Sequence, residues 1–306
     1  MSTKQNNRRN KKKSPIPAIV VLLLIIIPSV FSAVNNQLDK DKPTSVADND
    51  NNIIVHFLDV GQGDSEFIEF PDGKCMLIDA GTAEYSYTVT EAIENYGYSS
   101  IDYVVATHPH ADHIGGMTKV IESFDIGEIY MPRASTNTKT FENLLTAISD
   151  KGMSINTARA GVEIYSDSEL KIEFLAPVSN SYEDLNNYSA VLKITYGDNS
   201  FLFTGDAEDI SENEMLLYDY SSLSSDVLKV GHHGSYSSST AEFLNAVHPE
   251  YAIISCGKGN SYGHPHNETI ERFNDIGAQI YRTDKQGTIT VICDGNGSFD
   301  IQCEDK

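Results

Sequence analysis

Residues 108–113 read His-Pro-His-Ala-Asp-His and directly follow the apolar run 103–107. A run with paired valines predicts a buried strand, and binding sites are commonly built on the loops that follow strands. Four ligand-type side chains in six positions are typical of a hydrolytic metal centre, because imidazole and carboxylate groups bind zinc. The alternative is a polar loop that happens to be rich in histidine. The spacing favours two metals, with His108 and His110 on the first and Asp112 and His113 on the second.

Two later strand ends add candidate ligands. Asp206 ends the apolar run 201–206, where a carboxylate can bridge two metals about 3.5–4 Å apart. A carboxylate at this position also suits the cap of a following helix, but beside the histidine clusters the metal role is favoured. The segment 229–235 reads Lys-Val-Gly-His-His-Gly-Ser, so one histidine is expected to ligate and the other to support it or to contact substrate. We predict His232 as the ligand and His233 as the substrate contact.

A glycine-rich loop near the C-terminus carries further polar side chains. Lys258 and Tyr262 are predicted to contact substrate, and His264 to hold a substrate oxygen or to protonate a leaving group. A surface position before a helix is an equally good interpretation of His266. The predicted catalytic residues are Asp112, Asp206 and His264, and structural roles are assigned to His56 and His248.

Strand and helix patterns alternate from residue 53 onward. Strands are expected over 53–60, 65–70, 75–78, 103–107, 226–230 and 251–255, with a hairpin turning at Gly197-Asp198-Asn199 and closing strands near 287–293. Helices are expected over 87–96, 140–151, 208–220, 240–247 and 268–276. Strand blocks interleaved with helices imply sheets covered by helices, which is an α/β layer architecture.

The N-terminus predicts a membrane segment. Residues 1–15 carry six lysines and arginines, and the apolar segment 16–34 is close to the ~20 residues that a membrane helix needs. Basic residues stay on the cytoplasmic side, so the rest of the chain is expected outside the cell. We favour a single-pass anchor in the cell membrane over a cleaved signal sequence, which would release a secreted protein. The polar segment 35–52 is expected to be a flexible tether, and 53–306 the globular domain.

The net charge limits the partners that the protein can bind, and the cysteine content bears on its disulfides. The net charge is −22, and removing the six positive charges of 1–15 leaves −28 on the exported part. Such a surface repels polyanions and has no basic stripe of the kind that nucleic-acid binders use. The four cysteines have no C-x-x-C spacing, and Cys75, Cys256 and Cys293 lie in strand-like runs that predict core positions. A disulfide between Cys293 and Cys303 stays open as an alternative in an oxidising compartment.

Together these motifs resemble the metallo-β-lactamase superfamily, and within it the ComEC-like branch, stand-alone relatives of the C-terminal domain of the competence protein ComEC. The resemblance is carried by the H-x-H-x-D-H motif and by the segments 57–65, 77–81, 186–192, 201–206, 232–235 and 260–266, in that order. It implies an αββα four-layer sandwich following the membrane segment, with a metal centre, usually of zinc, at one edge of two sheets. It also implies that His108 and His110 bind the first metal, that Asp112, His113 and His232 bind the second, and that Asp206 bridges them.

One departure from the superfamily pattern concerns the first metal. Many members supply a third histidine just before the hairpin, whereas 185–189 reads Leu-Asn-Asn-Tyr-Ser here, as is usual in the ComEC-like branch. Asn186, Asn187, water or substrate is left to complete the site, and a carboxamide oxygen is a poorer zinc ligand than imidazole. We therefore expect two Zn²⁺ sites, of which the first is weak and also accepts Mn²⁺.

Three further aspartates match the family pattern. Asp79 is expected to brace the histidine loop from behind, and Asp59 and Asp64 flank a Gly-Gln-Gly turn near the site. All three also fit a role as turn formers.

The implied reaction is hydrolysis, in which a metal lowers the pKa of water towards ~7 and the resulting metal-bound hydroxide attacks an ester. The ComEC-like resemblance favours a phosphodiester, hence a nuclease acting on single-stranded DNA or a small phosphodiesterase acting on a head-group phosphodiester. The negative charge disfavours tight binding of long nucleic acid. The alternative is a non-catalytic tethered binding module of a DNA-uptake or cell-surface assembly, against which the intact ligand set argues. The sequence indicates no obligate protein partner.

Overall fold

The computed structural model describes Met1 and residues 51–304. The expected cytoplasmic segment, the apolar segment 16–34 and nearly all of the tether lie outside these residues, so those assignments stay predictions. Within the described part of the chain, no helix combines the length and the apolar character that a membrane crossing requires.

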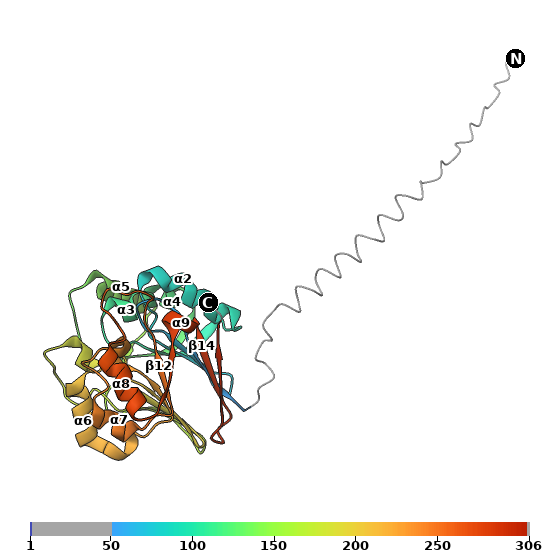
Figure 1. The fold of residues 1–306 in the computed structure, drawn as a ribbon. Coiled ribbons are helices and arrows are strands. Elements are labelled where there is room, and N and C mark those ends of the chain that lie inside the picture. Colours follow the sequence, from blue (N-terminus) through green and yellow to red (C-terminus); the bar gives the residue numbers. More distant parts are fainter. Residues whose placement is uncertain (2–50, 305–306) are drawn as a thin grey trace. The chain divides into compact units, whose positions relative to one another are not determined.

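Two mixed sheets form the globular unit (Figure 1). The eight-stranded sheet has the order β15 (Phe299–Cys303), β14 (Ile289–Cys293), β1 (Ile53–Phe57), β2 (Glu66–Glu69), β3 (Cys75–Ile78), β4 (Ser100–Val105), β5 (Asp125–Met131) and β6 (Ile155–Thr157). The seven-stranded sheet has the order β13 (Gln279–Arg282), β12 (Tyr251–Ile254), β11 (Val227–Lys229), β10 (Asn199–Phe203), β9 (Leu192–Tyr196), β8 (Leu170–Phe174) and β7 (Glu163–Ser166).

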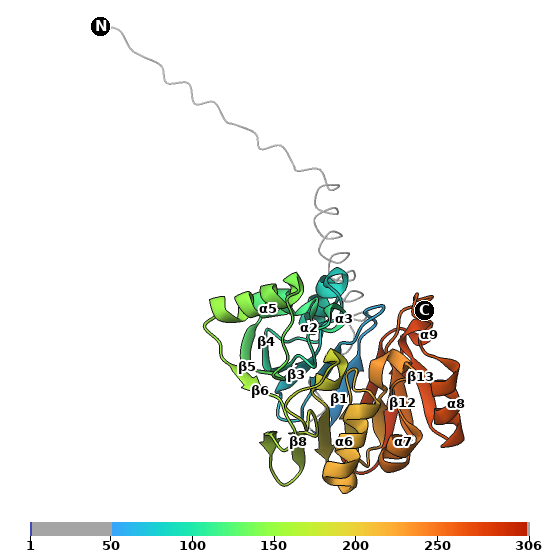
Figure 2. The same cartoon turned by 90° about the vertical axis from the view of Figure 1, so that its left-hand side faces the viewer.

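Helices cover the outer face of each sheet (Figure 2). The first sheet is covered by α2 (Ser86–Asn95), α4 (Met117–Ser123) and α5 (Lys139–Asp150), and the short α3 (Ala111–Ile114) follows β4. The second sheet is covered by α6 (Asp209–Asp219), α7 (Ala241–Val247) and α8 (Asn267–Asp275), and α9 (Thr283–Gln286) follows β13. The remaining turns are 3-10 helices: η1 (Ala83–Tyr85), η2 (Leu185–Tyr188), η3 (Tyr220–Ser222) and η4 (Gly231–Gly234).

Alternation along the strands produces these layers. On β10, Phe201 and Phe203 enter the core between the two sheets, whereas Leu202 enters the core under the second set of helices. On β2, Ile68 faces the space between the sheets and Phe67 faces the first set of helices. Because side chains alternate with period two, a strand buried on both faces reads as a continuous apolar run. The predicted αββα sandwich is confirmed.

The strands that carry the candidate ligands end at one edge of the sandwich. Strands β3, β4, β5 and β6 are parallel to one another, and so are β10, β11 and β12. Ligand sites in such sheets form at the carboxyl ends of the strands. The loops that follow β3, β4, β10 and β11 carry Asp79, the histidine cluster, Asp206 and the His232-His233 pair.

No cysteine of residues 51–304 is part of a disulfide. Cys75, Cys256 and Cys293 are buried as predicted, and Cys303 is exposed. The disulfide alternative is wrong, because the β14–β15 register pairs Cys293 with Phe299 and Cys303 with Ile289. Four residues of extended strand separate the two positions by roughly 13 Å, which is far more than a disulfide spans.

A buried carboxyl group gives the fold a pH dependence. Glu212 of α6 accepts hydrogen bonds from the backbone N–H groups of Ser239 and Thr240, at the start of α7. Burial nevertheless raises the pKa of Glu212 from 4.5 to about 7. The folded state therefore holds this proton more tightly than the unfolded state. Its stabilising contribution is complete below pH 4.5 and is lost as the pH rises through about 7.

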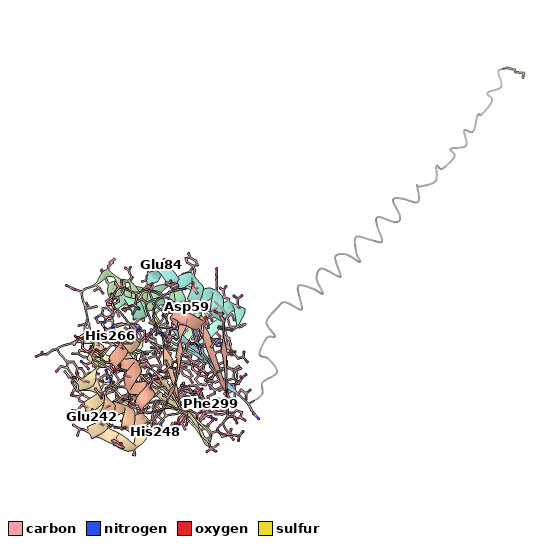
Figure 3. All side chains as sticks on the ribbon, viewed as in Figure 1. Asp59, Glu84, Glu242, His248, His266 and Phe299 are labelled. Carbon is pink, nitrogen blue, oxygen red and sulfur yellow. The ribbon has the colours of Figure 1, made fainter. Side chains whose placement is uncertain are left out.

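We expect the free energy of unfolding to fall by up to about 3 kcal/mol between pH 4.5 and pH 7.5 because of Glu212 alone. The measurement is urea denaturation at several pH values in the presence of a chelator. Glu212→Gln should flatten this dependence. Glu242→Gln, on the exposed side of α7 (Figure 3), is the matched control and should leave it unchanged. An equally steep dependence in Glu212→Gln would contradict the assignment.

Candidate metal centre

The histidine loop leaves the end of β4 and is held from behind by Asp79. The buried Asp79 carboxylate accepts hydrogen bonds from the Thr107 backbone N–H at 2.8 Å, from the Thr107 hydroxyl at 2.6 Å and from His113 Nδ1 at 2.7 Å. These contacts orient His113 so that its other nitrogen, Nε2, faces Asp206. The bracing contact predicted for Asp79 is present.

The first group of candidate ligands comprises His108, His110 and Asp206. One ligand atom from each of the three lies within 4.8 Å of the others. His108 Nε2 is 3.0 Å from His110 Nδ1 and 3.6 Å from Asp206 Oδ2. His108 is buried, whereas His110 is partly exposed at the mouth of the site.

The second group comprises Asp112, His113 and His233, whose ligand atoms also lie within 4.8 Å of one another. His233 Nε2 is 3.4 Å from Asp112 Oδ2 and 3.8 Å from Asp206 Oδ1. The geometry therefore reverses the prediction for the histidine pair. His233 is 1% exposed and faces Asp112 and His113, and His232 is not a member of the group.

Asp206 lies between the two groups. Its Oδ1 is 3.1 Å from His113 Nε2, and its Oδ2 is 3.6 Å from His108 Nε2. The preceding Gly205 has φ +50°, and a Cβ at this position would meet Thr107 of the histidine loop at 3.0 Å. Glycine thus lets the end of β10 approach the end of β4. The contact brings ligands from the two sheets together, as a bridging role for Asp206 requires.

A left-handed turn separates the two histidines of η4. His232 and His233 have φ values of +49° and +54°, which cost of order 1–3 kcal/mol each for residues other than glycine. The turn is held by hydrogen bonds from the His232 N–H to the Gly205 carbonyl and from the Ser235 N–H to the His232 carbonyl. His232 Nδ1 lies 3.2 Å from Glu208 Oε1, and its Nε2 remains 3.9 Å from Asp206 Oδ2. His232 therefore lines the site beside the second group.

Buried ligand atoms without partners test whether a metal fits. His113 Nε2, His233 Nε2 and Asp206 Oδ1 have no hydrogen-bond partner among the described residues, although they lie within 4 Å of one another or of a neighbouring carboxylate. Buried polar atoms are normally satisfied, so orphaned atoms that face one point require an explanation. A divalent cation satisfies all three, and the donor set of imidazole and carboxylate suits it.

The electrostatics of the cluster also call for a cation. Burial opposes a charge on His113, but Asp206 and Asp79 outweigh it and hold the pKa of His113 well above its usual range. Burial likewise opposes a charge on His233, yet Asp206 and Asp64 raise its pKa to about 10. Protons on these rings balance the carboxylates. We expect metal binding to displace them, because a ligating histidine must be neutral.

A buried ion pair supports His233 from the far side. Lys229, on β11, donates a hydrogen bond from Nζ to Asp64 Oδ2 at 2.6 Å, and both side chains are about 1% exposed. Asp64 Oδ1 lies 3.1 Å from His233 Nδ1, which also contacts the carbonyl oxygen of Ser255 at 3.1 Å. Burial would raise the pKa of Asp64, but Lys229 and His233 lower it to about 2. Asp64 thus orients the ring of His233, in addition to its place near the Gly-Gln-Gly turn.

The two asparagines of η2 have different environments. Asn187 Oδ1 accepts hydrogen bonds from the backbone N–H groups of Glu208 and Ser211 and so caps the start of α6. Asn186 lines the cleft above the metal ligands, and its Oδ1 is buried without a partner. Of the two asparagines left open by the sequence, Asn186 is therefore the one placed to complete the first site.

The C-terminal loop contributes only part of its predicted set. His264 and Tyr262 line the cleft of about 310 Å³ together with His110, His232, His233 and Asn186. Lys258 is exposed and is not among the lining residues. His266 precedes α8 (Figure 3). Its ring accepts a hydrogen bond from the Tyr236 N–H, which fits the surface interpretation.

The surroundings of His264 shift the pKa of this predicted proton donor downwards. Burial and the nearby His233 and His232 lower the pKa of His264 to about 4, so the ring is neutral at pH 7. The pKa of His232 is shifted the other way: burial opposes its charge, but the contact with Glu208 and the charge of Asp206 raise it. The carboxylates beside His232 thus favour its protonated form.

The two remaining histidines have structural contacts. His56 is buried, bonds to Glu69 at 2.8 Å and stacks on Tyr96 at a ring separation of 3.9 Å. His248 ends α7 with φ +51° and lies away from His266 (Figure 3). Both structural assignments agree with these positions.

Asp79→Asn is expected to weaken zinc binding by about 10- to 100-fold, because His113 loses the charged acceptor that orients its ring. The measurement is a competition titration against a chromophoric chelator. The control is Asp150→Asn, which removes the same charge from the exposed end of α5. Thermal unfolding of both variants in chelator separates a loss of metal affinity from a loss of fold. Unchanged zinc affinity in Asp79→Asn would contradict the bracing role.

Residues 58–258 match the family described as Metallo-beta-lactamase superfamily. The chain belongs to this superfamily. Its αββα layers and the clustered His and Asp side chains at the strand ends agree with that membership. The superfamily assignment also implies a divalent metal at this edge, which the orphaned ligand atoms fit.

The chain is also similar to curated proteins, one of which is named a competence protein. The chain is 31% identical over 252 residues to ComE operon protein 3 of Bacillus subtilis (77% of this chain, 32% of that protein). It is 29% identical over 249 residues to Competence protein ComA of Neisseria gonorrhoeae (81% of this chain, 33% of that protein). The chain thus spans about a third of the length of these relatives, and it is a ComEC-like metallo-hydrolase of the superfamily.

A solved structure supports the fold alone. CmlA, a diiron beta-hydroxylase from Streptomyces venezuelae, superposes with a TM-score of 0.51 at 14% identity, covering 76% of this chain and 53% of that chain. At this identity the likeness carries no inference about the reaction of the present protein.

Proposed function

We propose that this superfamily hydrolase cleaves phosphodiester bonds. The observation that carries the proposal is the pair of ligand groups that share Asp206, His108-His110 on one side and Asp112-His113-His233 on the other. Two-metal sites of this kind are used for in-line displacement at phosphorus. The competence proteins to which the chain is similar favour a nucleic-acid or related phosphodiester substrate.

The residues of the chain have separate roles in this proposal. When bound, a divalent cation lowers the pKa of water and stabilises negative charge on phosphoryl oxygens. Asp206 and Asp112 supply the carboxylates that hold the cations, and Asn186 completes the first group. His232, whose pKa is raised by its contact with Glu208, donates a hydrogen bond to a phosphoryl oxygen or a proton to the leaving group. His264, whose ring lies 5.5 Å from that of His232, and Tyr262 line the same cleft and position the substrate.

We propose Zn²⁺ for both groups, with the weaker first group also accepting Mn²⁺. The second group offers two imidazoles and a carboxylate that it does not share, which suits Zn²⁺. The first group offers two imidazoles, the shared Asp206 and a carboxamide oxygen, which is a weaker set for zinc. The complete ligand set disfavours the non-catalytic binding module.

We also propose that the domain acts outside the cell, held to the membrane by 16–34. The basic block and apolar run at the N-terminus support this placement. Protease added to intact cells should digest the hydrolase domain and spare cytoplasmic proteins. Full protection of the domain in intact cells would contradict export.

The test of the activity combines metal analysis with hydrolysis assays on the full-length protein. We expect bound zinc, and manganese when it is supplied, together with hydrolysis of bis-p-nitrophenyl phosphate and of single-stranded DNA. A chelator should abolish both activities, and added metal should restore them. A protein that retains no metal, or that hydrolyses no phosphodiester when loaded, would overturn the proposal.

A further inference from the structure

A second cavity, of about 470 Å³, is lined by positively charged side chains, which is unusual in this acidic chain. Its wall includes Arg133, Arg159, Thr157, Ser179 and Tyr188. Residues 51–304 contain four arginines, in a protein of net charge −22. Two of them have internal partners: Arg272 donates to the carbonyls of Ser238 and Ser239, and Arg282 pairs with Asp284. Two of the four arginines of residues 51–304 thus line one cavity.

Arg133 and Arg159 have no such partners. Both side chains are exposed, and neither forms a hydrogen bond or ion pair with another described residue. A carboxylate bonded to the wall, that of Glu214, accepts hydrogen bonds from Ser179 Oγ, the Ser179 N–H and the Tyr182 hydroxyl. That carboxylate is engaged in holding the wall. The two guanidinium groups keep free donors, whose planar geometry matches phosphate oxygens.

The fold places this cavity beside the metal centre on the same edge. In the first sheet, the histidine loop follows β4, Arg133 follows β5 and Arg159 follows β6, and these three strands are parallel neighbours. In the second sheet, Asp206 follows β10, and the segment with Ser179 follows β8, which runs parallel to β10 because β9 is antiparallel to both. Neighbouring strands are ~4.8 Å apart. An offset of one to two strands in each sheet therefore places the cavity roughly 5–10 Å from the metal ligands.

A single element, η2, separates the metal cleft from the arginine cavity. Asn186 and Tyr188 are both in η2, and Asn186 lines the metal cleft while Tyr188 lines the arginine cavity. A chain-like substrate that lies along this edge therefore passes from one space to the other across η2. An offset of one to two strands suits a phosphate that neighbours the scissile one.

We propose that the cavity lined by Arg133 and Arg159 binds a second phosphate of the substrate, and that the substrate is a short single-stranded oligonucleotide. This inference rests on the proposed phosphodiesterase function. Two arginines repel a choline cation, so the cavity disfavours a phosphocholine head group. The acidic remainder of the surface explains why the strand must be short: the phosphates beyond this cavity meet no comparable cluster of arginines in the described part of the chain.

The first arm of the test is kinetic and uses the full-length, metal-loaded protein. Arg133→Gln/Arg159→Gln is expected to raise the KM for hexathymidylate about tenfold or more with little change in kcat. It should leave kcat/KM unchanged for bis-p-nitrophenyl phosphate, which has one phosphate, and for p-nitrophenylphosphorylcholine. Lys74→Gln/Lys285→Gln removes the same charge far from the cavity, from the turn before β3 and from α9, and should match the wild type on all three.

The second arm measures binding without turnover. Fluorescein-labelled hexathymidylate is titrated into chelator-treated protein at several salt concentrations. Each phosphate contact on a single strand contributes about −0.7 to the slope of log K against log salt. One bound phosphate lost with the two arginines should reduce that slope by about 0.7, and the control variant should keep it. Circular dichroism melting verifies that all variants fold.

The outcomes separate this inference from the proposed function. The wild type can hydrolyse all three substrates while the arginine variant lowers every rate equally, or lowers none. This result overturns the phosphate cavity and leaves the proposed phosphodiesterase function intact. If hexathymidylate binding depends on the two arginines but the metal-loaded protein hydrolyses no phosphodiester, the proposed function is overturned and the phosphate cavity stands. A p-nitrophenylphosphorylcholine activity higher than that on hexathymidylate overturns the choice of substrate.

Discussion

Replacing Asp206 with asparagine is expected to lower kcat/KM for bis-p-nitrophenyl phosphate by at least about a thousandfold and to remove most of the bound metal. The carboxylate lies between both ligand groups, 3.1 Å from His113 and 3.6 Å from His108. Its loss removes a ligand shared by two cations, and the charge stabilisation that metals supply amounts to several kcal/mol. Metal content by mass spectrometry and the hydrolysis rate are measured on the same sample.

Asp198→Asn is the matched control for this variant. Asp198 is exposed in the turn that begins the same hairpin strand, at the opposite end of β10. The same charge is removed there without contact to the site, so metal content and rate should equal those of the wild type. Retention of both metals and of full activity in Asp206→Asn would exclude the bridging role.

The second large effect distinguishes the adjacent histidines. His233→Ala is expected to weaken zinc binding at the second group at least a hundredfold, because His233 is buried there and is held by Asp64. His232→Ala should retain zinc and lower kcat about 10²- to 10⁴-fold, which is the range for loss of a general acid. Equilibrium dialysis against zinc and steady-state kinetics measure the two properties.

Each histidine variant serves as the control for the other. Both alanine variants keep a Cβ at a left-handed position of η4, so the backbone cost is similar in the two. If His232→Ala loses zinc and His233→Ala retains it, His232 is the ligand, as the sequence predicts. The assignment of His233 from the geometry is then refuted.

Much of the site could be predicted because strand ends carry a clear signal. The runs before His108 and Asp206 are apolar on both faces, and the structure ends β4 and β10 three residues before each of them. Motif order then placed both groups on one edge. The element bounds agree to within a few residues, as for α7, whose observed range is Ala241–Val247.

The choice between His232 and His233 could not be made from the sequence. Alternation along a strand would assign opposite directions to the two rings, but both residues adopt left-handed φ values, so strand periodicity does not apply. The turn results from contacts with Gly205 and Ser235, which are set by the approach of two sheets. No local pattern encodes that approach.

The sequence position of Lys229 indicates a buried ion pair. A lysine inside the apolar strand Val227–Lys229 is rarely buried unless it is paired, so it pointed to an anionic partner. That partner, Asp64, is 165 residues away in the loop that precedes β2 of the other sheet. Arg133 and Arg159 offered no comparable signal, since β5 and β6 were not predicted and the arginines stand alone in the sequence.

The meeting of the two sheets at Gly205 and Asp206 makes the metal a cross-link of the whole sandwich. His108, His110, Asp112 and His113 come from one layer, and Asp206 and His233 from the other, so a bound cation joins halves that are distant in the chain. Ligands that bind only the folded state stabilise it in proportion to the logarithm of their concentration. The supply of zinc in the surroundings would then govern how long the domain survives proteolysis, as well as how fast it works.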